Sequence, residues 1–457
     1  MIDAVVACRD GIVPMAMAMA MAMAMAMARD AADLSRSRHD GLPRLIDHWR
    51  ALHAAVAVAR QGSTIRAARC IHLSQPAVTR AIAMLESACG QPLFLRTTRG
   101  MVPTPQGERL VARADACMEL VQRGAREALG ALACRTTRGN APERFARHLT
   151  PSRLRALLAV SGGGSESRAA EQLGLSQPAV HAALRALEQQ LDVPIFYKSA
   201  AGTRLTPPGD ALLLRVKQSL AELRALETEL SAWTGRTRGR IVVGILPLSA
   251  TIFLPRAIAA FMPKYPDMDV QVIDGTYETL VRLLRSAEID VLAGALRRGV
   301  PHADVAAHSL FVDDLVVIAN RRHPCWKKAR LELADLLQWP WVAPLPGTPA
   351  DRLLHALFAR HDLPAPSRSL CAGSPTMTLA CVLQSDRLAI ASRGQVLQDD
   401  HGGQIGIVPV RFAPVARRIG LLTRVLSDPA PPLAAFLDIC RHTTRDLPGA
   451  EGVHATA

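Results

Sequence analysis

The order of apolar and polar positions near residue 80 predicts an amphipathic helix. Apolar side chains recur three and four positions apart and fall on one face, at Val78, Ile82 and Leu85. Ser74 suits the N-cap of this helix, and Pro76 suits its first turn, where no backbone N–H is needed. The opposite face is polar, with Gln75, Thr79 and Arg80. Such a helix buries one face in a small domain and leaves the other to solvent or to a partner.

Two further helices are predicted before this one and a hairpin after it. Residues 45–60 are amphipathic, and the short helix that follows from Ser63 carries the small pair Ala67-Ala68, which lets another helix approach closely. Residues 92–95 and 101–104 can pair as short strands around a basic tip. Helix, helix, turn, helix and hairpin is the order of a winged helix-turn-helix, whose second motif helix enters the major groove of DNA.

This pattern occurs twice in the chain. Residues 61–78 recur as residues 163–180, and Ser-Gln-Pro-Ala-Val is identical in both copies. The offset of 102 positions continues beyond these segments without a gap, as expected of a tandem duplication. The sequence therefore predicts two winged helix-turn-helix domains, at residues 43–110 and 145–207.

Polar side chains at the start of each second motif helix are candidates to read base edges, and basic side chains in each wing are candidates to neutralise phosphates. The first copy offers Ser74, Gln75, Pro76, Thr79, Arg80, Arg96 and Arg99. The second copy offers Ser176, Gln177, Pro178, His181, Lys198 and Arg204. Because His181 and Ala182 stand where the first copy has Thr79 and Arg80, we expect that both copies fold but that they need not read the same bases. The alternative for Gln75 and Thr79 is an ordinary solvated helix surface.

These motifs resemble the LysR-type transcriptional regulators. The matching elements are Ala-Ala, Ser-Gln-Pro-Ala-Val, Leu-Glu, Pro-Leu-Phe-x-Arg and Thr-Pro-x-Gly, which begin here at residues 67, 74, 85, 92 and 104. The resemblance implies a sequence-specific, DNA-binding transcriptional regulator of the bacterial cytoplasm, with no cofactor and no membrane association. Its implied partners are double-stranded DNA, a small-molecule effector, RNA polymerase and further copies of itself, as a homodimer or homotetramer. The second winged domain departs from the family, which usually has one per chain.

A helical pattern follows each winged motif. Residues 208–235 gather apolar side chains near one face, at Leu212, Leu213, Val216, Leu220, Leu223, Leu230 and Trp233. This face predicts either packing on the helix's own domain or a dimer seam. Its position resembles that of the family's dimerising linker helix, which favours the seam. In the first copy, residues 108–134 look like a relic of the same helix within a segment 111–142, and the polar stretch 135–142 predicts a linker.

From residue 238 on, short apolar strands alternate with helices, which predicts parallel βαβ units in an α/β fold. Strands are predicted at 241–245, 270–273, 291–295, 315–319, 341–342, 388–391 and 405–410, and helices at 253–262, 280–287, 350–359 and 377–384. The stretch resembles the family's effector-binding half, a two-lobed fold like the type 2 periplasmic binding proteins. We expect the first lobe at 238–312 and 413–445, the second at 313–412, and a tail at 446–457. The predicted fold class is thus multidomain.

Ligands of open α/β sheets bind beyond the carboxyl ends of the strands, often at helix N-termini that favour anions. Hydroxyl and backbone N–H groups at these ends suit a small carboxylate. By the resemblance, the effector positions are Ser249, Thr251, Thr276, Gly347, Thr348, Ser374 and Thr376. The alternative for each hydroxyl is that it only caps its own helix.

The distribution of charge adds to this picture. Residues 1–240 hold 32 Lys and Arg against 20 Asp and Glu, whereas the rest holds 22 against 20. Only the first half is therefore expected to meet a polyanion. An alternative function, a solute-binding receptor with no DNA role, would leave both the duplicated motif and this asymmetry unexplained.

Low-complexity repeats, cysteine spacing and missing catalytic motifs argue against a membrane protein, a metal-binding protein and an enzyme. Seven Met-Ala repeats at 15–28 lie in a low-complexity tail, residues 1–40. As a helix they would span about 21 Å, short of the ~30 Å bilayer core. Nine cysteines include no Cys-x-x-Cys, which predicts reduced thiols and no metal site. Gly-x-Ser-x-Gly and phosphate-loop motifs are absent from the sequence, so we do not expect an enzyme.

Overall fold

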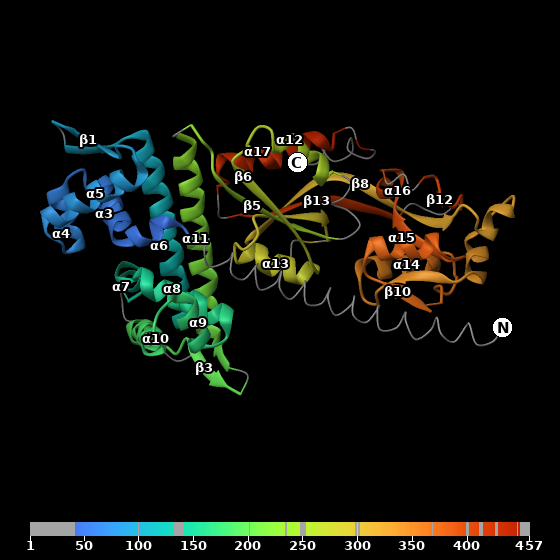
Figure 1. The fold of residues 1–457 in the computed structure, drawn as a ribbon, viewed down its shortest axis with the longest axis horizontal. Coiled ribbons are helices and arrows are strands. Elements are labelled where there is room, and N and C mark those ends of the chain that lie inside the picture. The colour runs from blue at the N-terminus through green and yellow to red at the C-terminus, as the bar shows by residue number, and fades with distance from the viewer. Residues whose placement is uncertain are drawn as a thin grey trace, which may run out of the picture. The chain divides into compact units, whose positions relative to one another are not determined.

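The computed structural model describes residues 42–447 except 99, 132–140, 201, 234, 247–252, 298, 300–301, 368, 399–401, 411–414, 426–427 and 446. The chain divides into two compact units, Met1–Glu227 and Thr228–Ala457 (Figure 1). The predicted Met-Ala tail and most of the predicted polar linker lie outside the described residues. Within the described part of the chain, no helix combines the length and the apolar character needed to cross a bilayer.

Unit 1 contains the two copies, each built from the same series of elements, and it ends at Glu227 within the last helix of the second copy. The first copy comprises η1 (Arg44–His48), α3 (Trp49–Gln61), α4 (Thr64–Ile71), α5 (Gln75–Cys89), β1 (Phe94–Thr97), β2 (Gly100–Pro103) and α6 (Pro105–Gly130). The second comprises α7 (Ala141–His148), α8 (Pro151–Gly163), α9 (Glu166–Leu173), α10 (Gln177–Leu191), β3 (Phe196–Ser199), β4 (Gly202–Leu205) and α11 (Pro207–Trp233). The helix predicted as a relic is thus the full-length α6.

One carboxylate in each copy holds the wing onto the second motif helix. Glu86 Oε1 accepts hydrogen bonds from the N–H groups of Leu93 and Phe94, at 2.9 and 3.2 Å. Glu188 Oε1 does the same for Ile195 and Phe196, at 2.9 and 3.1 Å. The Leu-Glu motif therefore has a structural role, which is to satisfy the backbone donors at the start of the hairpin.

Glycine at the tip of each wing is required by close backbone contact. Gly100 has φ +123°, and a Cβ there would lie 2.2 Å from the carbonyl oxygen of Gly62 at the end of α3. Gly202 repeats this with φ +105° and 2.4 Å to the oxygen of Gly164. The residue after each tip glycine donates its N–H to the same oxygen, at 2.9 and 2.8 Å. Each wing is therefore fixed to its own first helix.

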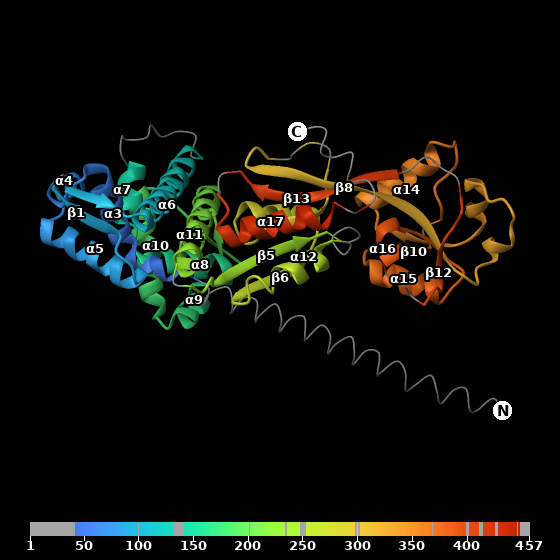
Figure 2. The same ribbon diagram turned by 90° about the horizontal axis from the view of Figure 1, so that it is seen from above.

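The apolar face of α11, predicted as a dimer seam, is buried within the chain. Leu212, Leu220 and Leu223 are at most 3% exposed. The helix that covers this face in unit 1 is α6, which lies beside α11 in both views (Figure 1, Figure 2). Contact is close, because a Cβ on Gly124 of α6 would lie 2.9 Å from the Cβ of Arg215 on α11.

Unit 2 is built on one nine-stranded sheet in the order β10-β9-β11-β8-β13-β7-β5-β6, with β12 also paired to β8. Its strands are β5 (Gly239–Ile245), β6 (Met268–Asp274), β7 (Val291–Ala295), β8 (Val305–Asn320), β9 (Trp341–Pro344), β10 (Leu370–Ala372), β11 (Leu388–Ser392), β12 (Ile405–Ile407) and β13 (Val415–Arg424). Its helices are α12 (Leu254–Phe261), α13 (Tyr277–Arg285), α14 (Pro349–Ala359), α15 (Pro375–Leu383), α16 (Arg393–Gln398) and α17 (Pro431–Thr443), with 3-10 turns η3 (Pro324–Lys327) and η4 (Leu333–Gln338).

The prediction of parallel βαβ units holds for only part of this sheet. Strands β6, β5 and β7 are mutually parallel neighbours, as are β10, β9 and β11. The centre differs, since β8 and β13 form a long antiparallel pair that joins the two parallel groups (Figure 1). The predicted lobe boundary at residue 312 falls inside β8. Each end has its own core, one around Phe261 and Phe436, the other around Trp341 and Phe358.

A buried ion pair fastens the central strands together. Asp313 on β8 pairs with Arg417 on β13, and both side chains are less than a tenth exposed. Ser392 Oγ on β11 also donates to Asp313 Oδ1, at 2.9 Å. One carboxylate thus connects three strands where the two parallel groups meet.

Candidate functional site

The first motif of unit 1 presents its predicted reading residues on the surface. Ser74, Gln75, Pro76 and Arg80 are exposed, and Thr79 is half-buried. Ser74 caps α5, since its Oγ accepts from the N–H of Ala77 at 3.3 Å. The apolar face behind them is fully packed, with Val78, Ile82 and Leu85 at 0%, 4% and 0% exposure. Helix α5 is therefore anchored by one face and free on the other, as a groove-reading helix must be.

The second motif has the same arrangement with a different polar set. Ser176, Gln177 and Pro178 at the start of α10 are exposed, and Ser176 Oγ accepts from the N–H of Ala179 at 3.4 Å. His181 is half-buried, and its Nδ1 lies 3.0 Å from Oε2 of Glu166, the first residue of α9. The sequence interpretation missed Glu166, although a glutamate in place of the first copy's Thr64 was a visible signal.

The wings carry exposed cations. Arg96 lies on β1, Lys198 on β3 and Arg204 on β4, and all three are exposed. Arg99 lies outside the described residues. These cations form no ion pair with a described residue, so they are available to an external anion such as a phosphate.

Unit 2 contains a large cleft at the ends of its strands. Its volume is about 1970 Å³, and turns after β5, β6, β7 and β9 line it. Thr276, Gly347 and Thr348, three of the predicted effector positions, are among the lining residues. Ser374 and Thr376 lie at the start of α15, next to the lining residue Gly373, but do not line the cleft themselves. Ser249 and Thr251 lie outside the described residues.

The predicted hydroxyls also cap their helices, as the alternative interpretation expected. Thr276 Oγ1 accepts from the N–H of Thr279 at 3.3 Å, and Thr348 Oγ1 accepts from the N–H of Asp351 at 3.2 Å. Ser374 Oγ accepts from the N–H of Met377 at 3.5 Å. The hydroxyl protons of Thr276 and Thr348 are donated to Thr279 Oγ1 and to the carbonyl oxygen of Leu345, at 3.0 and 2.7 Å. A contact to an anionic ligand therefore requires these protons to turn from their present acceptors.

Arginine is the main feature of the cleft that the sequence interpretation missed. Seven arginines line it: Arg297, Arg352, Arg360, Arg417, Arg418, Arg441 and Arg445. Among the described residues, two acidic side chains line it, Asp274 and Glu278. Scattered over some 150 positions, these arginines form no local motif. The excess of positive charge suits an anionic ligand.

Two titratable side chains in the cleft, Glu278 and His308, are affected by these arginines. Arg297 lies 2.9 Å from Glu278 and stacks 3.6 Å above the ring of Tyr277. A backbone hydrogen bond, and then the one from Arg297, lowers the pKa of Glu278. Burial, followed by repulsion from Arg441, lowers the pKa of His308, which also lines the cleft. The lowered pKa disfavours the charged form of His308 in the cleft.

Comparison with known families gives matches over most of the chain. Residues 49–108 and 151–210 both match the family described as "Bacterial regulatory helix-turn-helix protein, lysR family". Residues 234–445 match the LysR substrate binding domain. The two winged units and the cleft-bearing unit are therefore separately recognised modules.

Similar curated proteins are named as HTH-type transcriptional regulators. The HTH-type transcriptional regulator GalR of Pseudomonas putida is 33% identical over 85% of this chain and 95% of its own length. The HTH-type transcriptional regulator CbbR of Xanthobacter flavus is 29% identical over 60% of this chain and 82% of its own. Among solved structures, a full-length OxyR from Pseudomonas aeruginosa is 21% identical with a TM-score of 0.51, covering 66% of this chain and 97% of that one. This last match shows a shared fold.

Proposed function

Since the chain belongs to the LysR-type transcriptional regulators, and is a DNA-binding regulator with an effector-binding domain, we propose which residues carry out each task. The alternative function, a solute receptor with no DNA role, finds no support among the matches. We keep the winged domains at 43–110 and 145–207, the linker helix at 208–235 and the effector domain at 238–445.

We assign the reading of base edges to the exposed N-terminal ends of α5 and α10. Gln75, Thr79 and Arg80 serve the first copy, and Gln177 and His181 the second, with Ser74 and Ser176 as caps. A glutamine amide can pair in a bidentate manner with adenine in the major groove. Arg96, Arg99, Lys198 and Arg204 contact phosphates and supply affinity without sequence preference. The observation that carries this assignment is that both Ser-Gln-Pro corners are solvent-exposed.

We assign effector binding to the arginine-rich cleft, and the proposed effector is a small molecule with at least one carboxylate. Three of the seven arginines are paired with carboxylates, Arg297 with Glu278, Arg417 with Asp313 and Arg441 with Asp438. The other four, against Asp274, support a ligand of net negative charge. Thr276, Gly347 and Thr348 orient it, and the N-termini of α13 and α14 add favourable dipoles at the same cleft. Binding alters DNA recognition only as far as the effector prefers one arrangement of the protein over another.

Two general properties complete the proposal. We place the protein in the cytoplasm, where its DNA is accessible, and assign it no catalytic activity. The relatives are transcriptional regulators, and no group of three His, Cys, Asp or Glu side chains able to share a metal occurs among the described residues.

Selection of bound sequences from a random DNA pool tests the assignment. The full chain should enrich a defined motif, and Gln75→Ala and Gln177→Ala should each relax preference at one base by about 1–3 kcal/mol. Circular dichroism of each variant checks that it is folded. Folded variants with unchanged selectivity would contradict the assignment of these glutamines, and recovery of no motif would contradict the proposed DNA role.

A further inference from the structure

Helices α6 and α11 contact each other through equivalent positions of the duplication. Cys117 and Ser219 are 102 residues apart, so they correspond in the two copies. Cys117 Sγ donates to the carbonyl oxygen of Ser219 at 3.2 Å, and Ser219 Oγ donates to that of Cys117 at 3.0 Å. A reciprocal contact between equivalent residues is the signature of a two-fold axis. Here the axis relates two parts of one chain.

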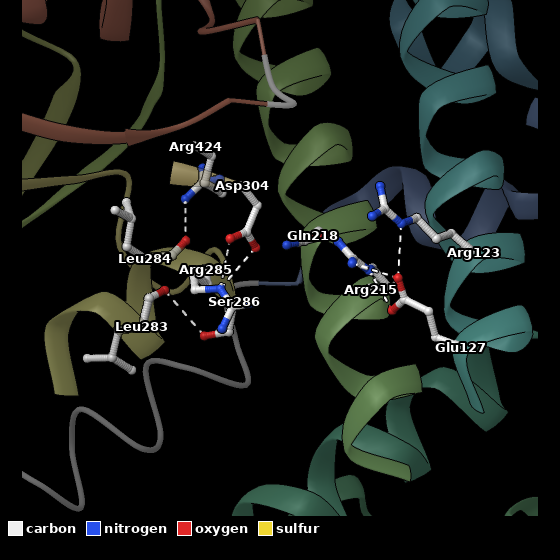
Figure 3. A network of polar contacts seen from close by, with 10 residues as sticks. All are labelled: Arg123, Glu127, Arg215, Gln218, Leu283, Leu284, Arg285, Ser286, Asp304 and Arg424. Carbon is white, nitrogen blue, oxygen red and sulfur yellow. Dashed lines mark hydrogen bonds and ion pairs between the residues drawn. The ribbon is translucent and has the colours of Figure 1, made fainter. Parts of the chain in front are cut away.

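A polar seam continues on both sides of this contact, with equivalent arginines that pair with non-equivalent glutamates. Arg113 on α6 pairs with Glu222 on α11 at 2.5 Å, and both residues are less than a tenth exposed. Arg215, the counterpart of Arg113, makes a bidentate pair with Glu127 on α6, at 2.7 and 2.9 Å (Figure 3). Residue numbers on α6 rise as those on α11 fall, so the helices are antiparallel.

The pairing keeps Glu127 in its charged form. Burial alone would raise the pKa of Glu127, but hydrogen bonds from Arg215 and Arg123 outweigh it and lower the pKa. Arg215 also donates to Gln218 Oε1 at 3.0 Å (Figure 3). Removing one partner of such a pair leaves an uncompensated charge in the interface.

Further contacts join the bodies of the two copies. Trp49 Nε1 in α3 donates to the carbonyl oxygen of Ala146 in α7 at 2.8 Å. Arg155 in α8 pairs with Asp47 at 2.8 Å, and the N–H of Leu45 donates to Glu227 Oε1 at 2.8 Å. Wing strand β1 lies near one end of the α6–α11 pair and β3 near the other (Figure 1). The two copies therefore form one antiparallel, pseudo-symmetric body.

We propose that this body is a dimer interface formed in cis, so that one chain presents α5 and α10 as two non-equivalent readers of an inverted, asymmetric operator. The inference rests on the proposed function and names the DNA that it recognises. Two-fold related motif helices bind half-sites related by the same symmetry. Because Thr79 and Arg80 are replaced by His181 and Ala182, the two half-sites differ in sequence.

A disulfide between equivalent positions distinguishes pairing within a chain from pairing between chains. Ser219→Cys places a second thiol opposite Cys117. Burial raises the pKa of the Cys117 thiol and slows its oxidation, so the full chain is treated for a long period with diamide, which accepts the two electrons and two protons that the two thiols lose. The expected product is an internally cross-linked monomer, seen as a shift in denaturing electrophoresis that a reductant reverses.

The double variant Cys117→Ser with Ser219→Cys is the matched control, since it keeps one thiol at the same place. It should give no shift, like the unchanged chain. A covalent dimer formed by Ser219→Cys alone would overturn the inference, because it would show α6 pairing with the α11 of another chain. Absence of any cross-link in the folded variant, judged by its unchanged circular dichroism, would overturn it as well.

The selected DNA motif supplies the second readout. Two inverted arms of different sequence support the inference, with Gln75→Ala relaxing one arm and Gln177→Ala the other. A palindrome whose two arms relax together in either variant overturns it, because that result requires pairing of like copies. An intrachain cross-link in a protein that selects no DNA would leave the helix pairing intact and reject the proposed function instead.

Discussion

The Nδ1 atom of His181 lies 3.0 Å from Oε2 of Glu166, whereas the equivalent positions of the first copy hold Thr79 and Thr64. A carboxylate accepts from an imidazole N–H, so this contact orients the ring and leaves Nε2 as the acceptor of the neutral form. The two recognition helices therefore differ in a side chain that is held in place by a second element.

Glu166→Gln should change base preference in one half-site only. The amide can donate as well as accept, so it no longer fixes which ring nitrogen carries the proton. We expect selectivity at one base position to fall by about 1 kcal/mol, the scale of one hydrogen bond. Competition binding with singly substituted operators measures this change. Thr64→Ser is the control in the first copy, and equal effects of the two variants would contradict the positioning role.

Gly124→Ala should destabilise the α6–α11 pair. The added Cβ would lie 2.9 Å from that of Arg215, so the helices must separate, at about 1–3 kcal/mol. Gly130→Ala in the same helix meets no atom within 4 Å and should be neutral or slightly stabilising. Thermal denaturation of the full chain compares them. Similar melting temperatures for the two variants would show that the approach at Gly124 is not tight.

Arg96→Ala should weaken DNA binding by a similar factor on all sequences. Loss of one phosphate contact reduces the slope of log affinity against log salt by about 1. Fluorescence anisotropy over a range of salt concentrations measures the slope. Arg256, an exposed residue of α12 in the other unit, offers a charge-matched control. A sequence-dependent loss in Arg96→Ala would instead indicate contact with bases.

Arg418→Gln should reduce stabilisation by carboxylate ligands. Arg418 is exposed in the cleft and makes no ion pair with a described residue, so its charge is available to a ligand. A panel of mono-, di- and tricarboxylates is screened for a rise in melting temperature, and the best ligand is titrated against both proteins. We expect at least a tenfold loss of affinity, about 1.4 kcal/mol. Arg256→Gln controls for net charge, and an equal loss there would place the ligand elsewhere.

Acid should destabilise the first winged domain through His53. Burial, then the charges of Arg147, Arg60 and His148, lowers the pKa of His53 from 6.5 to about 4, although Asp115 opposes this. The folded state therefore disfavours the proton that the unfolded chain accepts. The contribution of neutral His53 to the free energy of unfolding is fully present above pH 6.5. It is lost as the pH falls toward 4, by about 3 kcal/mol in all.

His53→Gln removes this proton linkage. Between pH 7 and pH 5 its melting temperature should fall less than that of the unchanged chain. Parallel falls in both proteins would assign the acid sensitivity to other groups.

Local motifs were the part of the fold that the sequence predicted well. Ser74 caps its helix as predicted, because a cap depends on residues three positions apart, and its equivalent Ser176 does the same. Strand β13 was missed, since Arg417 and Arg418 interrupt its apolar pattern and its partner β8 lies about a hundred residues earlier.

The sequence likewise could not predict which element packs against each predicted surface. Periodicity marked the apolar face of α11, but it carries no information on whether α6 or another chain covers that face. In the cleft, Thr276 and Thr348 were found because hydroxyls at helix starts form a recognisable pattern. Its arginines were not, because only the fold brings together side chains as distant as Arg297 and Arg441.

DNA cleavage from a reagent tethered to each wing tests the central claim most directly, namely that both copies read one operator from opposite ends. Thr98 and Ala200 are exposed equivalents at the two wing tips, and each is replaced in turn by cysteine after other accessible cysteines have been removed. We predict that the reagent at position 98 cuts one flank of the selected inverted site and the reagent at position 200 cuts the opposite flank. Cutting of both flanks from either position, or none from one of them, would contradict the claim.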